Sequence, residues 1–486
     1  MLVRQSKNTF VRFYDGKAYI TNQLTRYDRY YNETGADFLK EISRQERDVD
    51  DIISSLKALY GDSVNQKKLS DDFLSFVNDL EKNFFLVTGS NIKECDSKDI
   101  DFSYSLGNMK TKIYDFTQPT ETEVVNNTQD YGLEADQRNP ILKSIQFEIT
   151  SRCNERCIHC YIPTSKKDKG KDMSYEQFCK IIDEFADMGG LHVSLSGGEV
   201  FLHHDILKMI QYCRKKDMEI CILSNLVTLK DVQIPFIKAA NVSYIQVSLY
   251  SMTPEIHDAI TTAKGSFMRT KSAIEKLIKA DIPIQISCPL MNMNKDSYRE
   301  VLEYAKSLNI KVFSDFILMA QADLSTHNLE NRLSIEDTEK IIRQIIEFDL
   351  DYSKWVKEKR PLLETIETEK YRKQPICGVG INNFCVSENG DVYPCPGWQS
   401  YIVGNVKKQS LQNIWNKSSK LSSLRRITQS DFPKCISCDA RNFCTRCLER
   451  NYNEHQGDMF KISKHLCDVA FLTKRIHEEY EQRGLL

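Results

Sequence analysis

The sequence lacks a long hydrophobic run, a secretion signal and a strong net charge. None of its stretches approaches the roughly 18 consecutive apolar residues that a membrane helix needs. Arg4 and Lys7 near the start are not followed by the apolar core of a signal peptide. The formal net charge is −2, which leaves no broad basic surface for nucleic acid or an anionic membrane. These absences predict a cytoplasmic protein with no nucleic-acid partner and no membrane partner.

Cysteine, by contrast, is plentiful, with 16 among 486 residues. Disulfides are disfavoured in the cytoplasm, so cysteines in short regular clusters indicate metal ligands there. Four cysteines stand singly among apolar residues and are expected to be core side chains: Cys179, Cys213, Cys221 and Cys288. The length allows about two to four domains.

Residues 1–90 predict a winged-helix-like domain. Alternating segments at 10–14 and 18–22 flank Asp15-Gly16, which is a hairpin signal, and a third strand is expected at 25–30. Helical patterns follow at 34–42, 49–60 and 69–83. The segment holds 13 Lys and Arg against 14 Asp and Glu, a balance that disfavours the DNA binding usual for such domains.

The rest of the chain divides into three parts. Residues 91–140 are polar and show little periodicity in their hydrophobic residues. We interpret them as a bridging region that contains Cys95. Residues 141–350 alternate strand and helix, which predicts a parallel sheet in an α/β fold, a partial (β/α)6 TIM-like barrel. The six strands are expected at 144–150, 191–196, 218–224, 243–249, 283–289 and 310–318. Residues 351–486 are interpreted as a C-terminal Cys-rich iron–sulfur domain that ends in a helix.

The first cysteine cluster directly follows the first barrel strand, where barrel enzymes gather their chemistry. Cys153, Cys157 and Cys160 have the spacing C-x3-C-x2-C. Three thiolates in one loop can hold three irons of a cubane and leave the fourth iron open. Structural zinc is the alternative, but it needs four ligands, and His159 lies between two of the cysteines.

This spacing resembles the signature of the radical S-adenosylmethionine (SAM) superfamily, over residues 144 to about 350. The resemblance implies that SAM binds the open iron of a [4Fe–4S] cluster and is cleaved to a 5′-deoxyadenosyl radical. Gly197-Gly198-Glu199 matches the second motif of the family, in which Glu199 accepts a hydrogen bond from the SAM amino group. The resemblance further implies cofactor-binding roles for four residues: His159, Ser224, Asn225 and Ser248. One departure is that no Arg follows His257-Asp258, which leaves Lys264 as a weak candidate to bind the SAM carboxylate.

The C-terminal cysteines resemble the SPASM domain, which holds two auxiliary [4Fe–4S] clusters and brings the expected total to three. The distal cluster would take Cys435, Cys438, Cys444 and Cys467. The proximal cluster would take Cys377, Cys395 and Cys447. Its fourth ligand is expected to be Cys95, with an open iron or Cys385 as alternatives. Zinc ribbons are the competing interpretation of the C-x2-C pairs.

SPASM enzymes commonly modify peptides, and residues 1–90 resemble the peptide-recognition element of peptide maturases. That resemblance implies that a leader peptide adds as a strand beside 25–30, against the helix at 69–83. Five aromatic residues are candidates for the pockets: Tyr27, Tyr30, Tyr31, Phe73 and Phe76.

The sequence therefore predicts an enzyme that modifies a ribosomally made precursor peptide, by forming a thioether or another cross-link. An electron donor such as flavodoxin or ferredoxin would reduce the cluster. The alternatives are oxidation of a residue in a protein, as in sulfatase-maturing relatives, peptide epimerisation, and a non-enzymatic iron–sulfur protein that binds peptide. No catalytic acid or base can be named, although Glu148 and Asp315 are candidates if they face the barrel interior.

Overall fold

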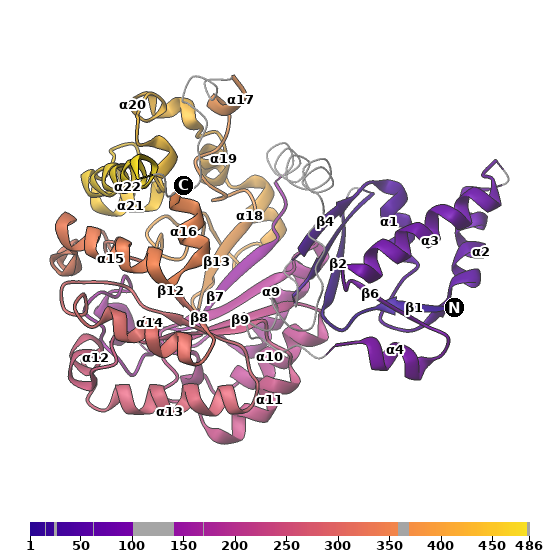
Figure 1. Ribbon diagram of the computed structural model, residues 1–486, viewed down its shortest axis with the longest axis horizontal. Helices are drawn as coiled ribbons and strands as arrows, with labels where there is room; N and C mark the ends of the chain where they lie inside the picture. The colour runs from indigo at the N-terminus through magenta and orange to yellow at the C-terminus, as the bar shows by residue number, and fades with distance from the viewer. Residues whose placement is uncertain are drawn as a thin grey trace.

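A computed structural model describes residues 1–14, 16–23, 27–61, 63–100, 140–168, 170–357 and 369–483. Most of the predicted bridging region lies outside these residues. Figure 1 shows an N-terminal domain on one side, a central sheet with helices around it, and the C-terminal segment above the sheet.

The central sheet confirms the predicted barrel, since its six barrel strands are parallel and follow one another in chain order. They are β7 (Ser144–Thr150), β8 (His192–Gly197), β9 (Glu219–Ser224), β10 (Tyr244–Ser248), β11 (Ile284–Ser287) and β12 (Lys311–Phe313). Alternate residues of the first five barrel strands, such as Ile145 and Phe147 of β7, are buried against the outer helices. Their neighbours Gln146 and Glu148 therefore point to the barrel interior.

Amphipathic helices cover the outer face of the barrel sheet (Figure 1). They are α9 (Tyr175–Asp187), α10 (Ile206–Lys215), α11 (Ile234–Ala239), α12 (Pro254–Thr261), α13 (Ser266–Lys279) and α14 (Tyr298–Ser307). On α9, for example, Phe178, Ile181, Ile182 and Phe185 are buried, and this spacing places them on one face. The short helix α8 (Thr164–Asp168) lies between β7 and α9.

The C-terminal segment extends the barrel sheet, which was not predicted. Strand β13 (Asn383–Ser387) pairs in parallel with β7. Strand β14 (Asp391–Tyr393) pairs antiparallel with β13, and β15 (Gly404–Asn405) pairs antiparallel with β14. Cys385 lies in the middle of β13, as expected. The cysteine-rich domain is therefore joined to the barrel by backbone hydrogen bonds.

Helices fill the rest of the C-terminal half. Among those described are α15 (Ile335–Phe348), α16 (Leu350–Lys357), α17 (Glu369–Arg372), α18 (Leu411–Lys417), α19 (Ser419–Arg425), α20 (Pro433–Ile436), α21 (Leu448–Glu454) and α22 (Lys464–Gln482). The predicted final helix is α22, and its Leu472 and Ile476 pack against Ile342 of α15. None of the described helices is both long enough and apolar enough to cross a membrane.

The N-terminal domain contains the predicted three strands and three helices. The strands β2 (Thr9–Tyr14), β3 (Lys17–Asn22) and β4 (Tyr27–Tyr31) form an antiparallel sheet with β4 at one edge. The helices are α1 (Glu33–Lys40), α2 (Val49–Tyr60) and α3 (Gln66–Lys82). A second, unpredicted sheet joins β5 (Arg47–Asp48), β1 (Leu2–Gln5) and β6 (Leu86–Gly89).

The N-terminal domain extends past the predicted boundary at residue 90. Helix α4 (Ile92–Lys98) packs beside β6, and the Cys95 side chain is fully buried there. Arg4 forms a buried ion pair with Asp99, which also accepts hydrogen bonds from the Lys7 backbone N–H at 3.1 and 3.2 Å. The first part of the predicted bridging region therefore belongs to this domain.

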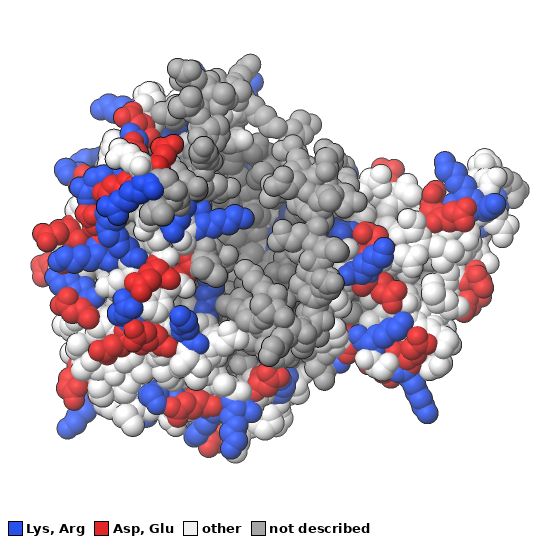
Figure 2. Space-filling view, viewed as in Figure 1, with Lys and Arg blue, Asp and Glu red and all other residues white. Residues whose placement is uncertain are grey.

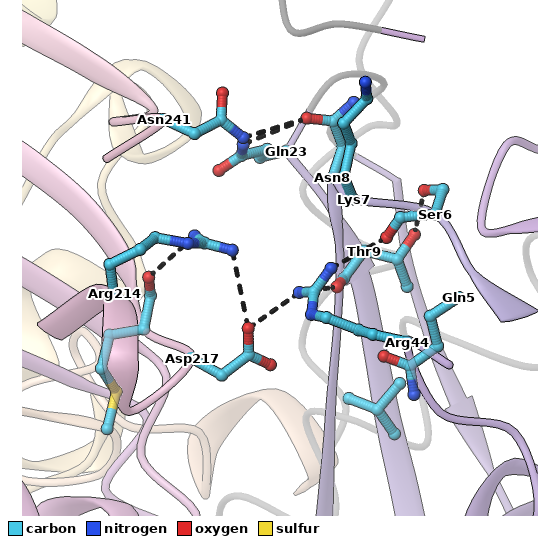
Figure 3. A network of polar contacts seen from close by, with 12 residues as sticks. Gln5, Ser6, Lys7, Asn8, Thr9, Gln23, Arg44, Arg214, Asp217 and Asn241 are labelled. Carbon is cyan, nitrogen blue, oxygen red and sulfur yellow. Dashed lines mark hydrogen bonds and ion pairs between the residues drawn. The ribbon is translucent and has the colours of Figure 1, made fainter. Parts of the chain in front are cut away.

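A polar network docks the N-terminal domain on the barrel (Figure 3). Asp217, which follows α10, accepts a hydrogen bond from Arg44 at 2.8 Å and forms a longer ion pair with Arg214 at 3.6 Å. Asn241 donates to Asn8 at 3.3 Å on the other side of this network. Directional contacts between described residues thus connect the N-terminal domain to the barrel.

Replacing Asp217 by asparagine is expected to loosen this docking. The substitution removes a charge shared by several arginines but retains a residue that tolerates the left-handed backbone at φ 53°. Since the side chain is partly exposed, the expected loss of stability is about 1 kcal/mol. Hydrogen exchange should rise at residues 1–14. Asp231→Asn is the control, because Asp231 pairs with Lys276 at 2.7 Å within the barrel; equal exchange in both variants would contradict the expectation.

Figure 2 shows the charge distribution on one face of the molecule. On the described part of that face, Lys and Arg are interspersed with Asp and Glu rather than gathered by sign. This mixture agrees with the net charge of −2.

Candidate active site

The loop after β7 carries three free cysteines, Cys153, Cys157 and Cys160. The loop is fastened to the last turn of α12, where the Arg156 and Ile158 N–H groups each donate to a backbone carbonyl at 3.0 Å. The Cys160 N–H donates to the Cys157 carbonyl at 3.1 Å, which closes a tight turn. The loop is therefore rigid and presents its three thiols from the carboxyl end of the first barrel strand.

The surroundings of these thiols favour a cationic group bound among them. Burial raises the pKa of Cys153 to about 11 and raises that of Cys157 far above its ordinary value. A cluster ligand must be a thiolate, so these positions need compensating positive charge from iron. Lys167 of α8 supplies further positive charge, although its side chain is only 5 % exposed. Burial lowers the pKa of Lys167, but the nearby thiols of Cys160, Cys153 and Cys157 raise it by more, so the net pKa is raised. This set of donors fits an iron–sulfur cluster.

Gly197 and Gly198 lie against the backbone that leads into the cysteine loop. A Cβ at Gly198 would lie 2.0 Å from the Arg152 carbonyl oxygen, and one at Gly197 would lie 2.4 Å from the Thr150 carbonyl oxygen. The Gly198 N–H donates to Thr150 at 2.7 Å, and the Glu199 N–H donates to Arg152 at 2.8 Å. The two glycines thus join the end of β8 to the start of the cysteine loop, which sequence reasoning did not predict.

The structure brings Glu199, Ser224 and Asn225 together, as the motifs predicted. One carboxylate oxygen of Glu199 accepts from the Ser224 hydroxyl at 2.7 Å and the Phe201 N–H at 3.0 Å; the other accepts from the Asn225 N–H at 2.8 Å. Burial raises the pKa of Glu199, while these hydrogen bonds oppose the rise. Because a carboxylate has about four lone-pair sites, one site remains for an incoming ammonium group.

A stack of rings lies beside the cysteine loop. The His159 ring meets the Tyr250 ring edge-on at 4.8 Å, and Tyr250 stacks on His257 at 5.4 Å. Burial lowers the pKa of His159 to about 4, so its imidazole is neutral. The His159 carbonyl accepts from Asn328 at 3.3 Å, which holds the backbone at the position expected to meet adenine. Ser248 lies at the end of β10, two residues before Tyr250, as expected.

The expected carboxylate-binding cation, Lys264, is not in the site. Lys264 is exposed in the turn before α13, and its carbonyl oxygen accepts a hydrogen bond from Arg269. The acidic side chain of Asp258 accepts from the N–H groups at the start of α13 instead of facing the cysteine loop. Lys167, which sequence reasoning missed within a lysine-rich stretch, is the buried cation beside the thiols.

The four predicted distal ligands lie together in the C-terminal domain. Burial raises the pKa of Cys444 to about 11, the nearby Arg446 lowers it, and three thiols raise it further: Cys467, Cys435 and Cys438. Cys467 comes from the first turn of α22, whereas the other three lie around α20. The arrangement agrees with the predicted set of distal ligands.

The predicted proximal ligands Cys377, Cys395 and Cys447 also share one region, but Cys95 does not join them. Burial raises the pKa of Cys447 to about 11, and Cys377 is among the groups that raise it further. Cys95 lies on α4 in the N-terminal domain, where it contacts Gly89 and interacts electrostatically with Arg4. Figure 1 places α4 at the opposite end of the molecule from α21 and α22. The expectation that Cys95 is a ligand is therefore wrong.

The barrel interior holds a polar group on the side of the C-terminal domain. Glu148, 2 % exposed, accepts from Gln399 at 2.7 Å and from Lys166 at 3.3 Å, so it faces inward. A cavity of about 450 Å³ adjoins Lys166, Gln399 and Tyr393. Asp315 accepts from Arg450 at 2.7 Å and is thus engaged in a link between β12 and α21.

The fold and these donor sets define a class of enzyme. Residues 147–308 match the model of the radical SAM superfamily, and residues 377–439 match the SPASM iron–sulfur cluster-binding domain. The chain therefore carries a radical SAM domain, which binds a [4Fe–4S] cluster and SAM, and a SPASM domain, which binds auxiliary iron–sulfur clusters.

Particular proteins resemble the chain to different extents. The AdoMet-dependent heme synthase of Methanosarcina barkeri is 26 % identical over 326 residues, 63 % of this chain and 91 % of that protein. The antilisterial bacteriocin subtilosin biosynthesis protein AlbA of Bacillus subtilis is 26 % identical over 323 residues, 64 % of this chain and 68 % of that protein. The crystal structure of Streptococcus suis SuiB bound to precursor peptide SuiA has a TM-score of 0.60 at 14 % identity, covering 96 % of this chain and 99 % of that chain. This last likeness shows the fold alone.

Proposed function

We propose that this protein modifies a ribosomally synthesised precursor peptide, forming a thioether or another cross-link after hydrogen abstraction by a 5′-deoxyadenosyl radical. The observation that carries the proposal is the extent of the structural likeness. It spans 96 % of the chain, N-terminal domain included, and the matching protein was solved with a precursor peptide bound. The name of AlbA also refers to the biosynthesis of a bacteriocin. The heme synthase of M. barkeri and AlbA align with nearly the same share of the chain, 63 % and 64 %, so the coverage of the sequence alignments does not separate them.

The edge strand β4 and the helix α3 supply a site where a leader could add as a strand. Tyr31 of β4 and Phe76 of α3 meet edge-on at 5.1 Å, and both rings are partly buried. Arg29 of β4 pairs with Asp79 of α3 nearby. Main-chain groups of an edge strand can bind any extended peptide, and side chains beside the edge provide selectivity.

The other predicted pocket residues have different surroundings. Phe73 is fully buried in the core of the domain, and Tyr30 contacts Tyr19 and Lys143 at the junction with the barrel. The Tyr27 side chain lies outside the described residues. Tyr31 and Phe76 are therefore the aromatic residues that we assign to leader recognition.

Phe76→Ala is expected to weaken leader binding about 10-fold, because one aromatic wall of the groove is removed. The affinity of the reconstituted full chain is measured with a labelled synthetic peptide, whose sequence is taken from a short cysteine-rich reading frame where one adjoins the gene. Cleavage of SAM without peptide should not change. Phe13→Ala is the control, because Phe13 lies on the opposite edge strand β2 and is 41 % exposed. Equal weakening by both substitutions would count against the groove.

Mass spectrometry of the same peptide after anaerobic incubation with enzyme, SAM and reductant tests the function. A cross-link removes the mass of two hydrogen atoms, and Cys153→Ala should abolish this loss. If 5′-deoxyadenosine forms and the peptide mass does not change, incubation in deuterated water separates epimerisation, which incorporates deuterium, from a wrong substrate. A modified folded protein in place of the peptide would overturn the proposal in favour of a sulfatase-maturase-like activity.

A further inference from the structure

The proximal cysteine set holds three thiols and leaves one position to be assigned. All 16 cysteines of the chain lie within the described residues, so every thiol can be placed. Cys95 lies in the N-terminal domain, and four others are in the barrel: Cys179, Cys213 and Cys221 on its helices and strands, and Cys288 directly after β11. Cys385 is the one cysteine left near the set in the C-terminal domain.

Glu449 is the acidic residue closest in sequence to this set, in the first turn of α21 and two residues after Cys447. Its side chain is 2 % exposed, although it belongs to a residue type that is almost never buried unpaired. One carboxylate oxygen lies so close to Gly397 that a Cβ there would be 1.9 Å away. Gly397 is itself two residues after Cys395, so the carboxylate lies against the segment that carries this cysteine.

The Glu449 carboxylate has no adequate partner. Within the part of the chain that is described, neither oxygen has a nitrogen or oxygen donor at bonding geometry, and the Cys395 thiol lies beside the carboxylate. The adjacent Arg450 donates to Asp315 at 2.7 Å instead. A buried carboxylate without a partner costs several kcal/mol, and such groups in native proteins are paired or bind metal.

The same carboxylate lies close enough to all three thiols to interact with them electrostatically. An iron–sulfur cluster among these four groups would offset their mutual repulsion.

Cys385 is placed less favourably than Glu449. It lies within β13, where its backbone is paired with Gln146 of β7 on one side and with Tyr393 of β14 on the other. A strand held on both sides cannot move toward the other three ligands. Glu449 has a longer side chain and projects from the turn that directly follows Cys447.

We propose that a carboxylate oxygen of Glu449 is the fourth ligand of the iron–sulfur cluster held by Cys377, Cys395 and Cys447. Carboxylate oxygen is a harder donor than thiolate, so one iron of this cluster differs from the other three and exchanges its ligand more readily. The assignment depends on the SPASM cluster and not on the identity of the substrate.

The test uses the full chain, reconstituted anaerobically, as wild type and as Glu449→Gln, Glu449→Ala, Glu449→Cys and Cys385→Ala. Each protein is also prepared with alanine at Cys153, Cys157 and Cys160, because the SAM-binding cluster has an open iron of its own. Mössbauer spectra distinguish an oxygen-ligated iron. Hyperfine spectroscopy of the reduced protein detects coupling to glutamate that is isotopically labelled in the carboxylate carbon.

We expect the wild type to show one distinct iron and coupling to the labelled carboxylate. Glu449→Gln and Glu449→Ala should lose both signals and about one iron per chain, giving the EPR signal of an oxidised three-iron cluster. Glu449→Cys should restore a four-iron cluster, and Cys385→Ala should match the wild type. Retention of the distal cluster shows that a variant has folded. Wild-type spectra for Glu449→Gln, or loss of the proximal cluster in Cys385→Ala alone, would overturn the assignment.

Discussion

Gly198→Ala is expected to abolish SAM cleavage by displacing the cysteine loop. The added methyl group would lie 2.0 Å from the Arg152 carbonyl oxygen and 2.5 Å from its carbon, and backbone cannot yield as a flexible side chain can. Arg152 directly precedes Cys153, so any relief of this contact shifts the first ligand. A displacement of about 1 Å can cost on the order of 100-fold in rate. The measurement is 5′-deoxyadenosine formation, together with the iron content of the reconstituted protein.

Gly61→Ala separates this effect from the general cost of replacing glycine. Gly61 has a left-handed backbone with φ 75°, and a Cβ there would meet nothing within 4 Å. Because Gly61 has ψ −171°, in a region that is essentially restricted to glycine, the cost of the substitution should be about 1–3 kcal/mol of stability, with SAM cleavage intact. Auxiliary clusters should persist in Gly198→Ala, because their ligands belong to the C-terminal domain. If Gly198→Ala cleaves SAM as fast as the wild type does, the cysteine loop adapts to the methyl group, and the close contact with Arg152 is not required for activity.

The barrel could be predicted because each of its strands carries the information locally. Residues such as Ile145 and Phe147 alternate with polar neighbours, and helical patterns separate the strands. Parallel strands then follow one another in chain order, as β7 to β12 do. Glu199 and Ser224 lie at the carboxyl ends of the neighbouring strands β8 and β9, and the hydrogen bond between them at 2.7 Å follows from this parallel order.

The contacts between domains could not be predicted in this way. Strand β13 pairs with β7 although more than 200 residues separate them, and no local pattern specifies such a partner. Cys95 was assigned by position in the chain, but α4 packs on β6 and holds this cysteine in the N-terminal domain. Glu449 was overlooked because a single acidic residue near a cysteine has no distinctive spacing. Its burial without a partner is visible only in the fold.

Glu199→Gln is expected to weaken SAM binding more than any other single change of a hydrogen-bonding side chain in the site. The carboxylate already accepts from Ser224 and Asn225, and the position that remains suits the amino group of SAM. An amide retains the shape but loses the charge, and its NH2 group would oppose the donors that now point to this position. Hydrogen bonds to charged groups contribute about 1.5–3 kcal/mol, so the dissociation constant should rise about 10- to 150-fold.

Equilibrium binding of SAM to the reconstituted enzyme measures this effect, and two variants bracket it. Ser224→Ala removes one of the three donors to Glu199 and should weaken SAM binding less than Glu199→Gln does. Glu184→Gln replaces a carboxylate on the outer helix α9, where it accepts from the Leu411 N–H at 2.6 Å, and should leave SAM binding unchanged. If Glu199→Gln binds SAM as the wild type does, the carboxylate only connects β8 to β9, and the amino group must find its acceptor elsewhere in the barrel. A loss of affinity with the cluster intact, larger than the loss in Ser224→Ala, would instead show that the charge of Glu199 binds the cofactor.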